Sequence, residues 1–417
     1  MSFHSTIRPV LVIFLLFGQF PLYGVLYRKP SRWQFRWTSF QTVFSLVLMV
    51  VGCFLCAVEY DRLQVIGVNA DNIIGPLFYA DVIIIMLLLL RVAHRWSSMI
   101  PKWDQVEALE VMQYNARQQD ARSARRIRAV ALALLVMGFV EHMLSIGKTL
   151  YAKVDEGRVC NWDYSNLPEY YALRTYGFFF RRVPYNFPSF IFLEYANTAL
   201  TMAWTVQDVL IIMISDSIAG FFDRLNARIQ FYSTVQVIAR EKFWSEIHSD
   251  YVMVCELLEH AMSICSPLLV VSCGTNLYLI CYQLFHLVES EKFIIMTVFT
   301  YYSLFFVILR TFLTLHYCSA VHEVARKPLK LCRRIPTTGW CEELERFYTF
   351  IRKSSIAVSA MGLFRLTKRT MLTMLGAVIT YELVMLHFVQ STANQGIVRE
   401  CSTEEFLFEP KMQSSAN

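Results

Sequence analysis

Long apolar blocks alternate with polar, Lys/Arg-rich stretches along most of the chain. Several blocks approach the ~20 residues that a helix needs to cross a hydrocarbon core about 30 Å thick. Lipid offers the backbone N–H and C=O groups no hydrogen-bond partners, so each spanning block must be helical. The pattern therefore predicts an all-α membrane protein with seven transmembrane helices, at residues 40–58, 75–92, 129–146, 190–214, 267–287, 293–315 and 371–389.

The amino-acid composition also indicates a protein that is surrounded by membrane lipid. Of its 417 residues 55% are hydrophobic and 17% charged, whereas an average soluble domain has about 25% charged residues. The net charge of +6 comes from basic loops between the apolar blocks, which favours a role in membrane orientation over nucleic-acid binding. The eleven cysteines lie mostly in or beside the spans, where cysteine packs as a small apolar residue. We predict no metal and no cofactor. Because neither a Walker loop nor an HExxH motif occurs, we predict no enzyme activity.

The first apolar stretch, residues 10–27, is not counted among the spans. It contains Pro21 and has basic residues on both flanks, so a crossing helix would carry one basic flank through the membrane. It also lacks the small-residue cleavage site of a signal peptide. We therefore expect an interfacial or re-entrant segment within a cytosolic amino-terminal region, residues 1–39.

The loop charges predict which way round the spans sit. The segment before the first span carries five cations and no carboxylate, namely Arg8, Arg28, Lys29, Arg32 and Arg36. By the positive-inside rule the amino terminus is cytosolic, and seven spans then place the carboxyl tail, residues 391–417, outside. The loop 216–259 contains seven carboxylates and fits this inverted topology less well. Only Cys160 and Cys401 would clearly face outside, so a disulfide between them is one alternative.

Three parts of the sequence resemble a known family. The run Thr380-Tyr381-Glu382-Leu383-Val384-Met385-Leu386-His387-Phe388 resembles the signature of insect gustatory receptors, in which a Gln stands where His387 does. The run Arg8-Pro9-Val10-Leu11-Val12 with Phe17-Gly18, Phe20-Pro21 and Phe35-Arg36-Trp37 is similar to the opening of the sugar-receptor branch, and so is Trp204-x-x-x-Asp208. The resemblance extends to chain length, span number and orientation.

The resemblance implies the insect chemoreceptor channel fold, in which four subunits surround one cation pore. It implies spans one to six with an outer ligand pocket in residues 40–318, a cytosolic loop and subunit-contact region in 319–370, and a pore-lining seventh span in 371–390. The expected function is a ligand-gated, non-selective cation channel opened by sugars in the plasma membrane of taste neurons. The chain would act as a homotetramer or in a mixed tetramer with related subunits.

Polar side chains inside the spans are the candidates for the ligand site, because such groups are costly in lipid. Glu194, Asn197, Thr201, Trp204 and Asp208 share one face of the fourth span. Carboxylates and amides with aromatic rings suit the hydroxyls and apolar ring faces of a sugar. We expect ligand contacts from Tyr79, Asp81, Glu141, His142, Glu194, Asn197, Thr201, Trp204, Asp208, Asn276, Tyr282, Gln283 and Tyr301. The alternative for any single residue is hydrogen bonding between helices. Arg310 is expected to pair with a carboxylate such as Asp208.

The seventh span supplies the pore candidates. Thr380, Val384 and His387 share one helical face, and Tyr381 and Phe388 share a neighbouring one. By resemblance, His387 and Phe388 mark the gate. Four protonated histidines around an axis would repel cations, so a homotetramer should conduct less in acid. The alternative is a histidine packed between subunits.

Other functions predict different features. A bitter or other tastant receptor of the same family is an alternative, because the sugar assignment depends on few positions. A receptor coupled to G proteins would have its amino terminus outside. A secondary transporter would contain internal repeats with broken helices, and we find no convincing repeat in the sequence.

Overall fold

The computed structural model describes residues 2–27, 29–69, 72–113, 116–163, 165–234, 241–287, 293–374, 376, 377 and 380. Its elements follow in chain order as α1 (Phe3–Leu16), η1 (Pro30–Arg32), α2 (Phe40–Ile66), α3 (Ile74–Glu107), α4 (Glu110–Gln113), α5 (Ala116–Val159), α6 (Leu167–Thr175), α7 (Gly177–Phe180), α8 (Phe187–Thr234), α9 (Glu241–Leu287), α10 (Ile294–Cys332), η2 (Thr337–Gly339), α11 (Glu342–Lys353), β1 (Ser359–Ala360) and β2 (Phe364–Arg365).

Six of these helices, α2, α3, α5, α8, α9 and α10, are long and apolar enough to cross a membrane. They contain the first five predicted spans and all but the first residue of the sixth. The seventh predicted span falls mostly outside the described residues, which reach it only at 371–374, 376, 377 and 380. In an apolar stretch of 18 residues, 83% of α8 is buried, against 28–39% in the other five helices. The central helix of the six is therefore α8. A helix that is apolar all round belongs in the middle of a bundle.

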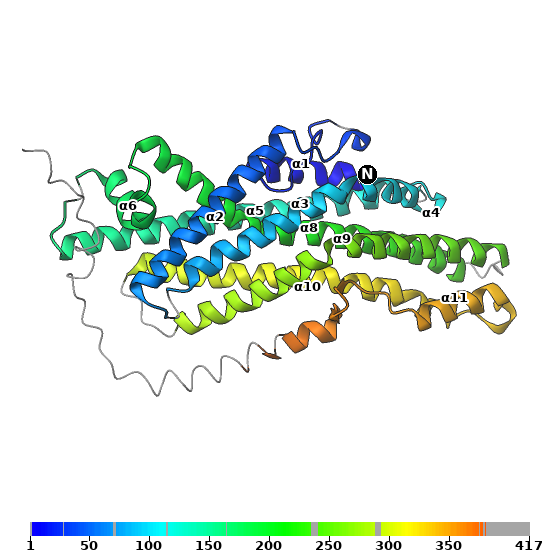
Figure 1. Ribbon diagram of the computed structural model, residues 1–417. Coiled ribbons are helices and arrows are strands. Elements are labelled where there is room, and N and C mark those ends of the chain that lie inside the picture. The colour runs from blue at the N-terminus through cyan, green and yellow to red at the C-terminus, as the bar shows by residue number, and fades with distance from the viewer. Residues whose placement is uncertain are drawn as a thin grey trace, which may run out of the picture.

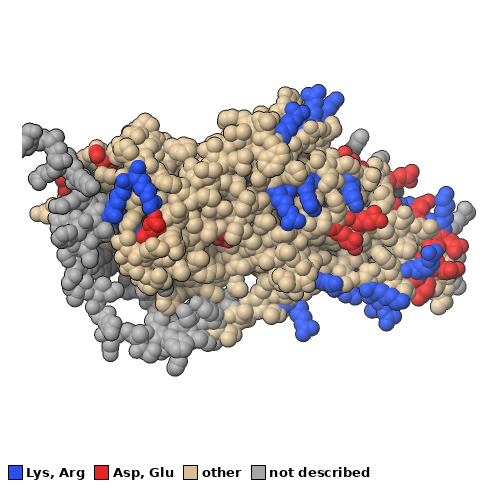
Figure 2. Space-filling model, in the orientation of Figure 1, with Lys and Arg blue, Asp and Glu red and all other residues tan. Residues whose placement is uncertain are grey.

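The bundle is elongated and has two different ends (Figure 1). We call the end that carries α6 and α7 the α6 end, and the opposite end, with α4 and α11, the α11 end. Figure 2 shows a broad uncharged band across the middle of the molecule, while most visible charged side chains lie toward the α11 end. This distribution matches spans surrounded by lipid and a polar extension at the α11 end.

The helices continue well past the predicted spans. With 48 residues, α8 is about 72 Å long at 1.5 Å per residue, more than twice the thickness of a hydrocarbon core. The connection 216–259 between the fourth and fifth spans is therefore mostly helical, since α8 extends to Thr234 and α9 begins at Glu241. Ile218, Phe222 and Leu225 are fully buried at helical spacing, while polar residues cover the other faces. An amphipathic helix outside lipid has low mean hydropathy, so hydropathy alone does not distinguish it from a loop.

The amino-terminal helix α1 packs on the bundle without crossing it. Its 14 residues span about 21 Å, less than a hydrocarbon core requires. Val10, Leu11 and Phe14 are fully buried, and the Gln19 side chain donates a hydrogen bond to the backbone carbonyl of Ala199 on α8 at 3.1 Å. This helix contains residues 10–16 of the apolar stretch 10–27, and the interfacial or re-entrant placement of that stretch stays a prediction.

The segment before the seventh predicted span is a two-stranded hairpin. Ser359 pairs with Arg365 and Ala360 with Phe364 in antiparallel register. The turn places Met361 and Gly362 at positive φ, a conformation that glycine adopts without strain. The hairpin follows α11, which packs its Leu344, Phe347 and Ile351 face against α9. Residues 319–370 are thus mostly ordered helix and hairpin.

Candidate functional site

A cavity of about 290 Å³ lies between α3, α8 and α9. Asp81 of α3 is its charged group, and it accepts hydrogen bonds from the Trp204 indole at 2.7 Å and from the Thr275 hydroxyl at 2.9 Å. The Phe78 ring lies one helical turn from Asp81 and contacts Trp204 edge-on, with ring centroids 5.1 Å apart. The remaining lining residues are Ile74, Leu77, Gly274, Tyr278 and Leu279. The cavity is therefore lined by one carboxylate and by several aromatic side chains.

A second polar cluster joins α5, α9 and α10. The Ser303 hydroxyl donates to the Glu141 carboxylate at 2.7 Å and accepts from the Gln283 amide at 2.8 Å. Glu141 and Gln283 are both predicted ligand residues, and a serine of α10 links them. Tyr302, next to Ser303, instead donates to the backbone carbonyl of Met137 at 3.1 Å. The cluster connects three helices with hydrogen bonds that lipid cannot compete for.

A third cluster lies at the α6 end. The Tyr79 hydroxyl donates to the Asn197 amide oxygen at 3.2 Å, and the Asn197 amide nitrogen donates to the Tyr176 hydroxyl at 3.3 Å. Burial, and next the nearby Glu194 carboxylate, raise the pKa of both Tyr171 and Tyr176. Both phenols therefore keep their protons at neutral pH and remain available as hydrogen-bond donors.

The core of the bundle holds a buried ion pair. The Arg310 guanidinium of α10 lies 2.9 Å from the Asp208 carboxylate of α8, with side-chain exposures of 2% and 0%. Asn276 donates to Asp208 at 3.0 Å and accepts from Arg310 at 2.6 Å, and Ser272 donates to Asp208. The pairing expected from the sequence is confirmed. Burial of this kind is tolerable only because each charge has its partner and further hydrogen bonds.

Comparison with known protein families decides the identity of the fold and family. The family model described as "Trehalose receptor" matches residues 1–401. The chain belongs to the trehalose receptor family. This match confirms the predicted gustatory-receptor relationship and the prediction of a receptor and not an enzyme.

Two Drosophila melanogaster proteins are among the relatives of this member of the trehalose receptor family. "Gustatory receptor for sugar taste 64a" is 27% identical over 403 residues, covering 96% of this chain and 87% of that protein. "Gustatory receptor 5a for trehalose" is 28% identical over 393 residues, covering 93% of this chain and 85% of that protein. Among solved structures, the insect olfactory receptor OR5 from Machilis hrabei in complex with eugenol aligns with a TM-score of 0.68 at 14% identity, over 92% of this chain and 97% of that one. The predicted insect chemoreceptor fold is confirmed.

The structure distributes the predicted ligand residues of this family member over several places. Asp81 and Trp204 meet in the cavity, whereas Asp208 and Asn276 are engaged in the ion-pair network. Thr201 donates to the Asn197 carbonyl of its own helix. Three further predicted residues lie elsewhere: His142 is buried on α5, Tyr282 stacks on Tyr278 with centroids 6.3 Å apart, and Tyr301 is 59% exposed.

The predicted pore residues are described only in part. Thr380 donates to the Gly376 carbonyl at 2.9 Å, as expected for a helical turn. Tyr381, Val384, His387 and Phe388 lie outside the described residues. Cys160 is disulfide-bonded, while Cys401, its partner in one of the alternatives from the sequence, lies outside the described residues too. Cys53 and Cys56, three residues apart in α2, are free thiols.

Several residues of these clusters were missed by sequence reasoning. Thr275, Ser272 and Ser303 are short hydroxyl residues, which are common in membrane helices and carry no signal on their own. Tyr171 and Tyr176 belong to the connection between α5 and α8, where the sequence has no apolar period to place them. Asn276 and Tyr301, which lie near the missed hydroxyls in the sequence, are among the predicted ligand residues. A search for hydroxyls within one helical turn of each intramembrane amide or carboxylate would have found Ser272 and Thr275, near Asn276, but not Ser303, which has neither group within a turn on its own helix.

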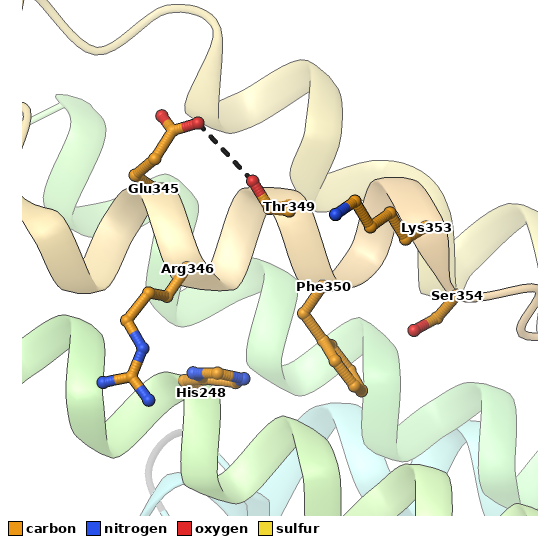
Figure 3. A pocket seen from close by; sticks show the side chains of 7 residues that line it. All are labelled: His248, Glu345, Arg346, Thr349, Phe350, Lys353 and Ser354. Carbon is orange, nitrogen blue, oxygen red and sulfur yellow. Dashed lines mark hydrogen bonds between the residues drawn. The ribbon is translucent and has the colours of Figure 1, made fainter.

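A separate pocket of about 420 Å³ lies at the α11 end, between α9 and α11. Figure 3 shows the Arg346 side chain beside the His248 ring, while Glu345 faces Thr349. The Thr349 hydroxyl donates to Glu345 at 3.5 Å. Because this pocket lies in the charged extension of the helices, it is distinct from the three polar clusters of the bundle.

Proposed function

We propose that the chain is a subunit of a sugar-gated, non-selective cation channel in the plasma membrane of taste neurons. Support comes from the trehalose receptor family match, from relatives whose names specify sugar taste, and from the olfactory-receptor fold. The observation that carries the ligand class is the cavity at Asp81. A sugar offers hydroxyl groups to a carboxylate and apolar ring faces to aromatic side chains.

The cavity residues divide the work of sugar recognition in this proposal. Asp81 accepts from ligand hydroxyls in place of, or beside, Thr275, while Trp204 holds the carboxylate in position and presents its ring face. Phe78 and Tyr278 supply further aromatic surface. The volume of about 290 Å³ is near the lower limit for ligand pockets, which favours a small polyhydroxy ligand. Sugar binding would then move the seventh span, whose Thr380 and His387 would line the pore, and so open that pore between four subunits.

Calcium imaging with a sugar panel tests this proposal, with the chain expressed alone and together with related subunits. Asp81→Asn keeps the shape of the side chain and removes its charge. Loss of charge-assisted hydrogen bonds should raise the half-maximal sugar concentration roughly ten-fold or more. Responses only to bitter or other non-sugar tastants would replace the sugar assignment, and an unchanged sugar response of Asp81→Asn would contradict the site.

A cavity-filling variant provides an independent test of the same site. Gly274 lines the cavity, and a Cβ added there would meet no atom within 4 Å. Gly274→Leu therefore meets no obstruction at its Cβ, and its longer side chain should block sugar from the cavity. Gly220→Leu is the matched control, because Gly220 of α8 also has open space around its Cβ position and does not line the cavity. Equal sugar responses of the two variants would refute the location.

The proposed channel requires an inverted topology, with a cytosolic amino terminus and an extracellular carboxyl terminus. Epitope tags at the two ends, probed in unpermeabilised cells, should give surface labelling only at the carboxyl end. Labelling at the amino end would instead support a receptor coupled to G proteins.

A further inference from the structure

A cluster of exposed cations has no counterpart in the proposed channel mechanism. We define the amino-terminal basic patch as Lys29, Arg32 and Arg36 together with Arg91 and Arg95 of α3, all of which are exposed. The chain contains no Asp or Glu before Glu59. Within the part of the chain that the structure describes, none of the five cations forms an ion pair with a carboxylate. The positive charge of the patch is thus left uncompensated.

The patch is held in place by a stapled loop. Tyr23 and Gln34 form a β-bridge, and the buried Trp33 donates its indole N–H to the Tyr27 carbonyl at 3.1 Å. Arg32 lies over the Tyr27 ring at 5.2 Å and Arg36 over the Tyr23 ring at 4.4 Å. These contacts fix the direction of both guanidinium groups.

A ring contact brings the second part of the patch alongside the first. Phe35 meets His94 of α3 edge-on, with centroids 5.1 Å apart, and Trp37 lies 6.2 Å from the same ring. His94 lies between Arg91 and Arg95 in the sequence. The five cations therefore come from two segments that are distant in sequence and are joined by aromatic packing.

Apolar and aromatic side chains are exposed beside the cations. Leu26 is 65% exposed, Tyr27 50%, Trp37 60% and Phe40 79%. Figure 2 shows Lys and Arg side chains at the upper edge of the molecule, over the region of α1 in Figure 1 and next to the uncharged band. Trp, Tyr and basic residues beside an apolar band are the combination that is enriched where a bilayer passes from acyl chains to headgroups.

We propose that the amino-terminal basic patch binds the headgroups of anionic phospholipids. Exposed Phe40 and Leu26 would lie in the acyl region, the aromatic rings at the boundary, and the guanidinium groups on lipid phosphates and carboxylates. A soluble acidic protein would satisfy the cations and leave the neighbouring apolar side chains unmatched. The patch thus provides a lipid site separate from the sugar cavity, with a preference for negative headgroups.

Native mass spectrometry of the purified full-length protein in detergent tests the proposal. Phosphatidylserine is titrated against phosphatidylcholine, and bound lipids are counted for the wild type and for two double variants, Arg32→Gln/Arg36→Gln and Arg91→Gln/Arg95→Gln. We expect phosphatidylserine to bind more tightly than phosphatidylcholine. Each double variant should weaken phosphatidylserine binding roughly 25-fold, because each of its two lost cations contributes about five-fold near a lipid surface.

Lys330→Gln/Arg334→Gln is the matched control, because it removes two exposed cations at the end of α10 and should leave lipid binding unchanged. Size-exclusion profiles verify that each variant is folded. Equal affinity of the wild type for the two lipids would overturn the proposal, and so would wild-type phosphatidylserine affinity in both double variants. An acidic peptide that binds more tightly than phosphatidylserine, and is lost in both double variants, would assign the patch to a protein partner instead.

Discussion

The buried ion pair between Asp208 and Arg310 gives a sharp prediction about the stability of the bundle. Arg310→Gln removes the guanidinium that lies 2.9 Å from Asp208 and also donates to Asn276 at 2.6 Å. The Asp208 carboxylate keeps the hydrogen bonds from Ser272 and Asn276, but its charge is then uncompensated in the core. It must remain charged there or take up a proton, and either outcome costs free energy of folding.

The geometry sets the size of the effect. At 2.9 Å and an effective dielectric constant near 20, the Coulomb attraction is about 6 kcal/mol. Removing one partner of a buried pair costs about 3–5 kcal/mol after the surroundings relax. The double variant Asp208→Asn/Arg310→Gln has no uncompensated charge, and its amides can still bond Ser272 and Asn276. The double variant should therefore lose less stability than the two single variants lose in sum, by at least about 2 kcal/mol.

Thermal unfolding of detergent-solubilised protein, followed by size-exclusion chromatography, measures these differences. The single variants should melt lower than the wild type by on the order of 5 °C, with partial recovery in the double variant. Neither residue lines the cavity, so the double variant should keep its sugar response. Wild-type stability of Arg310→Gln, or strictly additive losses in the double variant, would refute the argument from charge compensation.

Two further predictions concern packing and pH. A Cβ at Gly138 would lie 2.6 Å from the Thr205 hydroxyl and 3.3 Å from the Phe306 ring, so Gly138→Ala should lower stability by about 1–3 kcal/mol. Gly220→Ala, with open space around its Cβ, should be neutral or stabilising by up to about 1 kcal/mol; equal melting temperatures would contradict this. In patch-clamp recordings between pH 8 and 5.5, current through a homotetramer should fall as His387 gains a proton near pH 6.5. His387→Gln should abolish that fall, and identical pH responses of the two proteins would place the histidine away from the ion path.

Local information in the sequence was sufficient to place the membrane helices. Each apolar block is long enough to cover a hydrocarbon core, and that property depends on consecutive residues alone. The six described spans therefore lie where hydropathy predicts them. The carboxyl-terminal motif and the amino-terminal run also identified the family, which the match over residues 1–401 confirms. Hydropathy does not show how far the helices continue past the membrane, because the extensions of α8 and α9 are helices with one polar face.

The grouping of the polar residues was decided by tertiary structure. Glu194, Asn197, Trp204 and Asp208 share one face of α8, as their spacing predicts, but 14 residues of helix extend over about 21 Å. Along that length the face meets different neighbours: Tyr176 at the α6 end, Asp81 of α3 further along, and Arg310 of α10 in the core. Helical periodicity defines a face and not the partner at each level, since partners come from helices far away in sequence.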